Sequence, residues 1–200
     1  MKVLCLGDSL TYGYGLPRDQ IWTALAAAGT GVEFVNRALN GNTTGGMLAA
    51  LHREMEAASP DAVVLMGGSN DIIYGGDIGG AKSNLGAMVH IASAACVLPI
   101  LGTPLRSCPP IRTEWAAMMD GQETEQMIDV YAQWIRRLSR TFRLPLIDFY
   151  QTFPQRIIQH GWALRDCYME DGLHPNSRGH SVMAEIAAET IMALQNTPAR

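Results

Sequence analysis

Lysine is almost absent from this chain, which has only Lys2 and Lys82 among its 200 residues. Fifteen basic side chains face nineteen acidic ones, so the formal net charge is -4 and no basic patch for nucleic acid is expected. Charged residues make up 17% of the chain, against roughly 25% in an average soluble domain, and 48% are hydrophobic. This balance argues against a disordered or coiled-coil protein and predicts one compact domain over residues 1–200.

Cysteine is scarce and scattered. No C-x-x-C pair occurs, and no histidine lies at a spacing that would indicate zinc, so no metal site is expected. We expect free and mostly buried thiols at the four positions Cys5, Cys96, Cys108 and Cys167.

Long apolar runs are also missing, since none reaches 18 residues. Four apolar residues follow Lys2 and end at Gly7, a run that is too short for the core of a signal peptide. We therefore expect a cytoplasmic protein without a membrane span.

Short apolar runs alternate with longer stretches of helical periodicity, a pattern typical of a parallel sheet covered by helices on both faces. The apolar runs predict five strands, at residues 2–6, 32–36, 62–66, 95–101 and 144–149. Helices are expected at residues 20–28, 44–58, 78–92, 124–142 and 177–194. Right-handed crossovers then give a three-layer α/β/α domain that binds ligands at the C-terminal ends of its strands.

The longest connection runs from residue 102 to residue 121. It is interpreted either as a lid or pocket wall, or as an ordinary surface excursion with one packed helical turn.

Ser9 directly follows the first predicted strand, in the sequence Gly-Asp-Ser-Leu at residues 7–10. A serine at this edge can attack a bound carbonyl, although a serine in such a place is also a common helix cap. A phosphate-binding loop does not fit, because Tyr12 stands where its second glycine is due. The nucleophile elbow G-x-S-x-G fails as well, because residue 11 is threonine. Asp8 is expected to cap the turn.

His174 is the histidine placed to act as a base, because it lies in Asp-Gly-Leu-His-Pro-Asn at residues 171–176, before the last predicted helix. One tight turn brings Asp171 to the imidazole Nδ1 and directs Nε2 toward the serine. An isolated D-x-x-H is more often a simple turn, so its weight comes from the combination with Ser9. Structural roles are expected for the other four histidines, His52, His90, His160 and His180.

Two further strand ends carry groups that can donate to a developing oxyanion. Gly41, within residues 40–46, offers a backbone N–H with no side chain in the way. Asn70, within Gly-Gly-Ser-Asn-Asp at residues 67–71, offers an amide at the same edge of the sheet. Each is ordinary turn chemistry by itself. Together with Ser9 and His174 they supply the groups that serine esterolysis requires.

Four segments of this chain resemble, in the same order, the four sequence blocks of the SGNH hydrolases, also called the GDSL esterase/lipase family. The segments are residues 7–10, 40–42, 68–71 and 171–174. The resemblance covers residues 7–179 and implies a flavodoxin-like fold with sheet order 2-1-3-4-5, and ester hydrolysis through a serine acyl-enzyme without a cofactor. It implies that Ser9 is the nucleophile, His174 the general base and then acid, and Asp171 its orienting partner. The N–H groups of Ser9 and Gly41 and the Asn70 side chain would form the oxyanion hole. The opening Gly-Asp-Ser-Leu-Thr-Tyr-Gly looks most like the bacterial thioesterase/lysophospholipase/arylesterase subgroup.

The expected partner is a small-molecule ester, either a carboxylic or a thio ester of a small or lipid-like acyl group. A carbohydrate O-acetyl esterase or an acyltransferase on the same fold stays open, whereas a non-catalytic binding module is disfavoured because every catalytic position is filled. Apolar and aromatic residues that follow the catalytic blocks are candidates for the acyl pocket, although they are equally typical of core: Tyr12, Tyr14, Ile72, Ile73 and Tyr74. Weaker candidates are Trp115, Met118, Met119 and Trp162.

Overall fold

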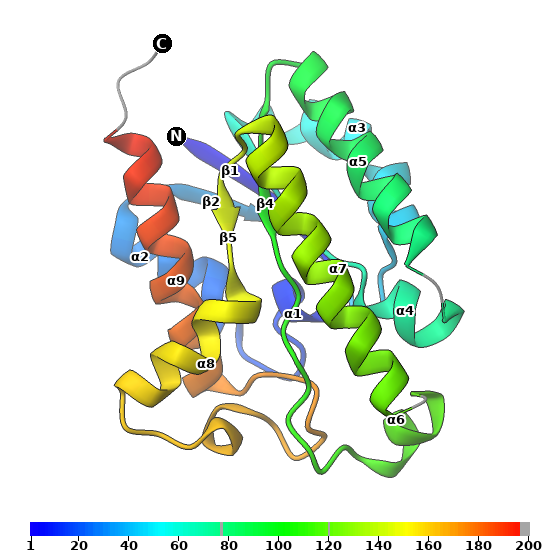
Figure 1. Cartoon of the computed structure of the whole chain (residues 1–200). Coiled ribbons are helices and arrows are strands. Elements are labelled where there is room, and N and C mark those ends of the chain that lie inside the picture. Colours follow the sequence, from blue (N-terminus) through cyan, green and yellow to red (C-terminus); the bar gives the residue numbers. More distant parts are fainter. Residues whose placement is uncertain (77, 120, 197–200) are drawn as a thin grey trace.

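The computed structural model describes residues 1–76, 78–119 and 121–196. Its centre is a five-stranded sheet in which every pairing is parallel and the strand order is β2-β1-β3-β4-β5, as predicted (Figure 1). The strands are β1 (Lys2–Gly7), β2 (Glu33–Asn36), β3 (Ala62–Met66), β4 (Leu98–Gly102) and β5 (Leu146–Ile147).

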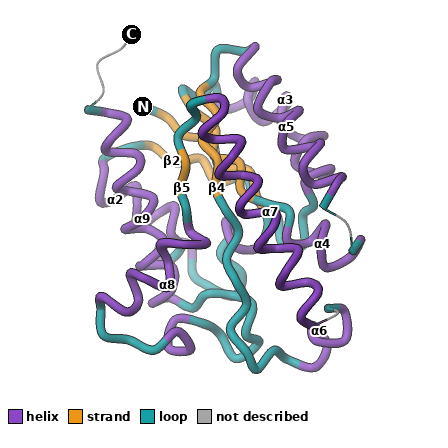
Figure 2. The backbone as a smooth tube through the Cα atoms, viewed as in Figure 1, coloured by secondary structure: helices purple, strands orange, loops and turns teal. Residues whose placement is uncertain are grey.

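Helices cover both faces of the sheet, with α2, α8 and α9 on one side and α3, α5 and α7 on the other (Figure 2). The α-helices are α1 (Ser9–Tyr12), α2 (Trp22–Thr30), α3 (Thr44–Ala58), α4 (Ser69–Gly75), α5 (Gly79–Ala94), α6 (Thr113–Met118), α7 (Gly121–Phe142), α8 (Phe149–Gln159) and α9 (Ser177–Gln195). Two short 3-10 helices are η1 (Arg18–Gln20) and η2 (Leu164–Cys167).

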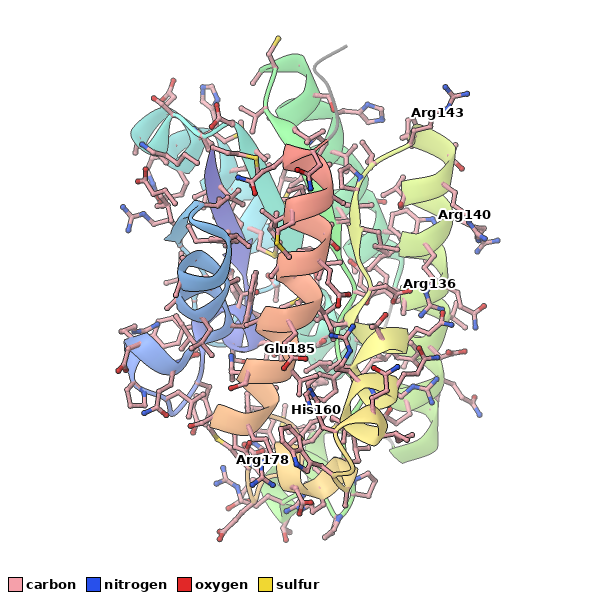
Figure 3. All side chains as sticks on the ribbon, turned by 90° about the vertical axis from the view of Figure 1, so that its left-hand side faces the viewer. Arg136, Arg140, Arg143, His160, Arg178 and Glu185 are labelled. Carbon is pink, nitrogen blue, oxygen red and sulfur yellow. The ribbon has the colours of Figure 1, made fainter. Side chains whose placement is uncertain are left out.

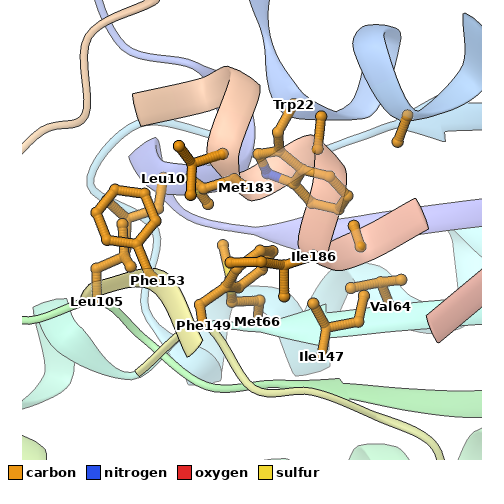
Figure 4. Packing of buried hydrophobic residues seen from close by; sticks show 14 of the residues in the cluster. Leu10, Trp22, Val64, Met66, Leu105, Ile147, Phe149, Phe153, Met183 and Ile186 are labelled. Atoms are coloured by element: carbon orange, nitrogen blue, oxygen red, sulfur yellow. The ribbon is translucent and has the colours of Figure 1, made fainter. Parts of the chain in front are cut away.

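Strand β3 shows why the apolar runs are continuous. Val64 and Met66 point into the core beneath α2, α8 and α9, where Trp22 and Phe149 also pack (Figure 4). Residues 63 and 65 alternate with them and belong to the opposite core cluster. Because both faces are covered, no position of the strand can be polar, and each buried aliphatic side chain contributes about 1.5–3 kcal/mol.

The last two strands differ from the prediction. Strand β4 begins at Leu98, because the preceding residues form the turn after α5, where Cys96 has a φ of 57°. Strand β5 has only two residues, since Asp148 caps the unpredicted helix α8 by accepting a hydrogen bond from the Gln151 N–H. The cysteine prediction is confirmed, because all four thiols are free and only that of Cys96 is exposed.

Strands β1 and β3 end close together at one edge of the sheet. A Cβ on Gly7 would lie 2.5 Å from the carbonyl oxygen of Met66, so only glycine permits this approach. The segments that follow the strand ends, among them α1 and α4, gather at this edge, which lies in the lower half of Figure 1.

Candidate active site

Ser9 is the first residue of α1, immediately beyond the end of β1. The carboxylate of Asp8 caps this helix by accepting a hydrogen bond from the Leu10 N–H over 2.9 Å. Burial raises the pKa of Asp8 to about 7. The negative charge of Asp71 also raises this pKa, whereas the hydrogen bond from the Leu10 N–H lowers it. Asp8 therefore fixes the turn that presents Ser9.

Ser9, His174 and Asp171 form one continuous chain of contacts. The Ser9 Oγ lies 2.9 Å from His174 Nε2, and His174 Nδ1 lies 2.6 Å from Asp171 Oδ2. His174 and Asp171 are both buried. The fold thus brings together three residues that the sequence separates by as many as 165 positions.

The Asp171 carboxylate is organised to stay ionised. Its Oδ1 accepts the N–H groups of Leu173 at 2.9 Å and His174 at 3.0 Å, while Oδ2 faces the imidazole. Burial opposes ionisation, but these hydrogen bonds and the imidazole outweigh it and lower the pKa of Asp171 below its ordinary value. An ionised Asp171 favours the imidazole tautomer with its proton on Nδ1, which leaves the Nε2 lone pair for Ser9.

The loop that carries these two residues, 169–174, is here called the acid–base loop. It is bound to residues 103–112, the wall segment, by hydrogen bonds from the Cys108 N–H to the Gly172 oxygen (2.7 Å) and from the Arg112 N–H to the Asp171 oxygen (3.0 Å). Gly172 has a φ of 75°, and a Cβ there would lie 2.6 Å from the Pro110 oxygen. Only glycine allows the two segments to approach so closely.

Asn70 lies at the start of α4 with its amide held in one orientation. Its Nδ2 donates to the Asn42 carbonyl over 2.9 Å, which leaves a second amide hydrogen for another acceptor. The next residue, Asp71, accepts the Thr44 N–H over 2.9 Å and so joins the beginnings of α4 and α3. Gly41 has a φ of 71°, and within the described residues no hydrogen bond uses its N–H.

A cavity beside Ser9 opens to solvent, and the empty space within it and at its mouth together amounts to about 470 Å³. Ile73 and Met119, both predicted candidates, line it, as do Leu105, Arg106 and Ser107 from the wall segment. The pocket-wall interpretation of residues 102–121 is therefore the one that the structure supports, with residue 120 outside the described part. The remaining lining residues are Asp8, Ser9, Leu10, Ser69, Asn70, Glu125, Ile128, Leu173 and His174.

The other predicted pocket residues do not line this cavity. Ile72 is 1% exposed and belongs to the core, because it lies about 100° around the helix from Ile73. The Tyr12 ring packs under the Arg18 guanidinium, 3.8 Å from it. Tyr74 is exposed and borders a separate hollow that also contains Asn70.

Aromatic rings surround the imidazole instead. The ring centroids of Tyr14 and Trp115 lie 4.4 Å and 6.2 Å from that of His174. Trp162 stacks on His160, which contacts Glu185 of α9 on another part of the surface (Figure 3). Met118 is exposed and does not line the cavity.

One feature of the site was missed from the sequence. Glu125 lines the cavity, but a single glutamate on an amphipathic helix gives no signal of this. His180, which is 1% exposed, accepts the Trp22 N–H at its Nδ1 over 3.0 Å and so joins α9 to the start of α2. This contact agrees with the structural role expected for His180.

Among the residues described, no group of three or more histidine, cysteine or acidic side chains is arranged to hold a metal ion. The described helices likewise include none that is long and apolar enough to span a membrane.

The model of the GDSL-like lipase/acylhydrolase family matches residues 5–182. The chain belongs to this family. Family membership, the fold and ester hydrolysis by a serine hydrolase are thereby confirmed as predicted.

Two curated relatives bear names of the predicted subgroup. An arylesterase from Vibrio mimicus is 26% identical over 196 residues, which cover 96% of this chain and 88% of the relative. The thioesterase 1/protease 1/lysophospholipase L1 of Escherichia coli strain K12 is 25% identical over 196 residues, which cover 97% and 85%. A crystal structure of a lipolytic G-D-S-L family protein from Veillonella parvula has a TM-score of 0.78 and 26% identity, covering 96% of this chain and 98% of that one.

Proposed function

We propose that this protein hydrolyses carboxylic or thio esters of small or lipid-like acyl groups through an acyl-enzyme on Ser9. The observation that carries the proposal is the unbroken contact chain from Ser9 Oγ through both nitrogens of His174 to Asp171. The arylesterase and thioesterase names of the two curated relatives support this substrate class.

In the proposed acylation step, the Ser9 oxygen attacks the carbonyl carbon while His174 Nε2 takes the hydroxyl proton. Asp171 stabilises the imidazolium that forms. The negative charge on the carbonyl oxygen is taken up by the N–H groups of Ser9 and Gly41 and by the free amide hydrogen of Asn70. Collapse of this intermediate breaks the bond to the alcohol or thiol, which leaves with the proton from Nε2.

Deacylation repeats these steps with water. His174 Nε2 removes a proton from the water as its oxygen attacks the acyl carbon, and then returns that proton to Ser9 as the acid is released. The cavity beside Ser9 receives the acyl group.

Labelling with a fluorophosphonate tests the proposal, because only an activated serine displaces its fluoride rapidly. We expect one adduct, mapped by mass spectrometry to Ser9, which is absent in Ser9→Ala and strongly slowed in His174→Ala. Ser69→Ala is the matched control, since Ser69 lines the same cavity but contacts no base. An unlabelled folded protein, or labelling that His174→Ala leaves at full rate, would refute the assignment.

A further inference from the structure

The cavity beside Ser9 has a polar side that a purely aliphatic acyl group does not explain. Much of its lining is apolar, for example Leu105 and Ile128. Three polar side chains, Arg106, Ser107 and Glu125, interrupt this surface. Polar groups in a binding cavity determine which hydrogen-bonding groups a ligand must present. The hydrogen bonds that these side chains already make therefore indicate the chemistry of a suitable ligand.

The Arg106 side chain is 56% exposed and already has an acidic neighbour. Its Nη2 lies 3.6 Å from Asp129 Oδ1, and its guanidinium carbon lies 4.3 Å from the centroid of the Tyr150 ring. These contacts hold the guanidinium against α7 and α8.

Ser107 and Glu125 are paired and fixed in place. The Ser107 hydroxyl donates to Glu125 Oε1. On one side of Ser107 the Arg106 oxygen accepts the Tyr168 hydroxyl over 2.6 Å, and on the other the Cys108 N–H donates to Gly172 over 2.7 Å. The pair is therefore held by backbone contacts on both sides.

This pair offers acceptors to the cavity. An ionised carboxylate can only accept hydrogen bonds, and the serine has used its single donor on it. Within residues 1–76, 78–119 and 121–196, no hydrogen bond uses Glu125 Oε2. A group that binds here must consequently donate.

Glu125 lies where the cavity beside Ser9 adjoins a second hollow. Glu125 and Arg106 border this outer hollow with Asp129 and Tyr150, and that hollow contains none of the three residues Ser9, Asn70 and His174. Glu125 and Arg106 thus separate the cavity from this hollow. An acyl group that starts at Ser9 and extends along the cavity toward this hollow would meet the carboxylate.

Building on the proposed function, we propose that Ser107 and Glu125 form a subsite for a hydrogen-bond donor on the acyl group, a hydroxyl above all, and that they disfavour a methyl group at the same place. The preferred substrates are therefore esters of hydroxy acids rather than of unsubstituted fatty acids of the same size.

Two pairs of ethyl esters test this inference, with acid release followed in a pH-stat. Ethyl 3-hydroxybutanoate is compared with ethyl 3-methylbutanoate, and ethyl 6-hydroxyhexanoate with ethyl heptanoate, so that each pair exchanges only a hydroxyl for a methyl at one position. An apolar end would favour the methyl ester about fourfold, the value of one buried methyl group. We expect the native protein to favour the hydroxy ester in at least one pair, by about tenfold, as for a hydrogen bond to a charged group.

Glu125→Leu should abolish that preference and favour the methyl ester, and Glu125→Gln, which keeps the shape and one acceptor, should reduce it. Gln126→Leu is the matched control, because Gln126 is the next residue of α7 and borders only the outer hollow. A native preference for both methyl esters, or ratios that Glu125→Leu leaves unchanged, would overturn the inference while ester hydrolysis itself stands. If the native protein hydrolysed none of the four esters although the fluorophosphonate labels Ser9, the inference would fall and the proposed function would stand. If Ser9 were not labelled either, both would fall.

Discussion

When the pH is lowered from 7 to 5, the free energy of unfolding of the native protein should fall by about 2 kcal/mol more than that of the His180→Asn variant. Burial, reinforced by the charge of His174, lowers the pKa of His180 from 6.5 to about 4. Its Nδ1 accepts the Trp22 N–H and must therefore be unprotonated in the fold. The unfolded chain binds a proton below about pH 6.5 and the folded chain does not, so stability falls as the pH falls through this window.

The magnitude follows from the two pKa values. With 6.5 in the unfolded chain and about 4 in the fold, the linkage relation gives a loss of about 2 kcal/mol at pH 5 and close to zero at pH 7. An asparagine side chain does not titrate, and its amide oxygen can still accept the Trp22 N–H. The His180→Asn variant therefore removes the titration while it keeps an acceptor at this position.

Urea unfolding of the native protein and His180→Asn at both pH values measures the effect. The quantity of interest is the difference between the two losses of stability, because contributions from Asp8 and other shared groups then cancel. Equal losses in both proteins would refute the reasoning.

Three further predictions concern the turns around Ser9. Asn70→Ala should lower kcat about 100- to 1,000-fold with little change in melting temperature, as for the loss of one oxyanion donor, and an unchanged kcat would contradict that role. Gly172→Ala should lose both stability and activity in melting and turnover assays, whereas Gly161→Ala, also at positive φ but with no atom within 4 Å of its Cβ, should lose only about 1 kcal/mol. Asp8→Asn should gain stability relative to the native protein as the pH rises from 4 to 8, by up to about 4 kcal/mol, because the raised pKa of Asp8 means that the fold disfavours its charged carboxylate. If urea unfolding gave both proteins the same dependence of stability on pH, this prediction would be wrong.

The sheet and the candidate triad were accessible from the sequence because each depends on local patterns. Because both faces of the sheet are covered, β3 and the part of β1 after Lys2 carry no polar side chain, and parallel strands bring their C-terminal ends to one edge. Ser9 and His174 adjoin such ends or a helix start, so their meeting follows from the topology. Helix α8 was not predicted, because Phe149 continues an apolar run that is typical of a strand. Only Asp148, which caps the helix, indicates where the strand ends and the helix begins.

The cavity lining was less predictable, because it depends on how helices rotate against one another. Ile72 and Ile73 are adjacent residues of the same type, yet Ile72 packs in the core and Ile73 lines the cavity. Glu125 reaches the cavity only because α7 lies against the wall segment, a contact between elements that no local pattern encodes.

The hydrogen bonds between the wall segment and the acid–base loop have a consequence for how this enzyme can change. Residues that line the cavity beside Ser9 and the loop that carries Asp171 and His174 belong to one hydrogen-bonded unit, so we expect a deletion or loop exchange within residues 103–112 to displace Asp171 as well. If the proposed roles hold, substrate range and turnover change together, and we expect new specificities to arise from side-chain substitutions in the wall segment rather than from changes in its length. In directed evolution, libraries that vary side chains at Leu105, Ser107 and Glu125 should retain far more active members than libraries that vary the length of this segment.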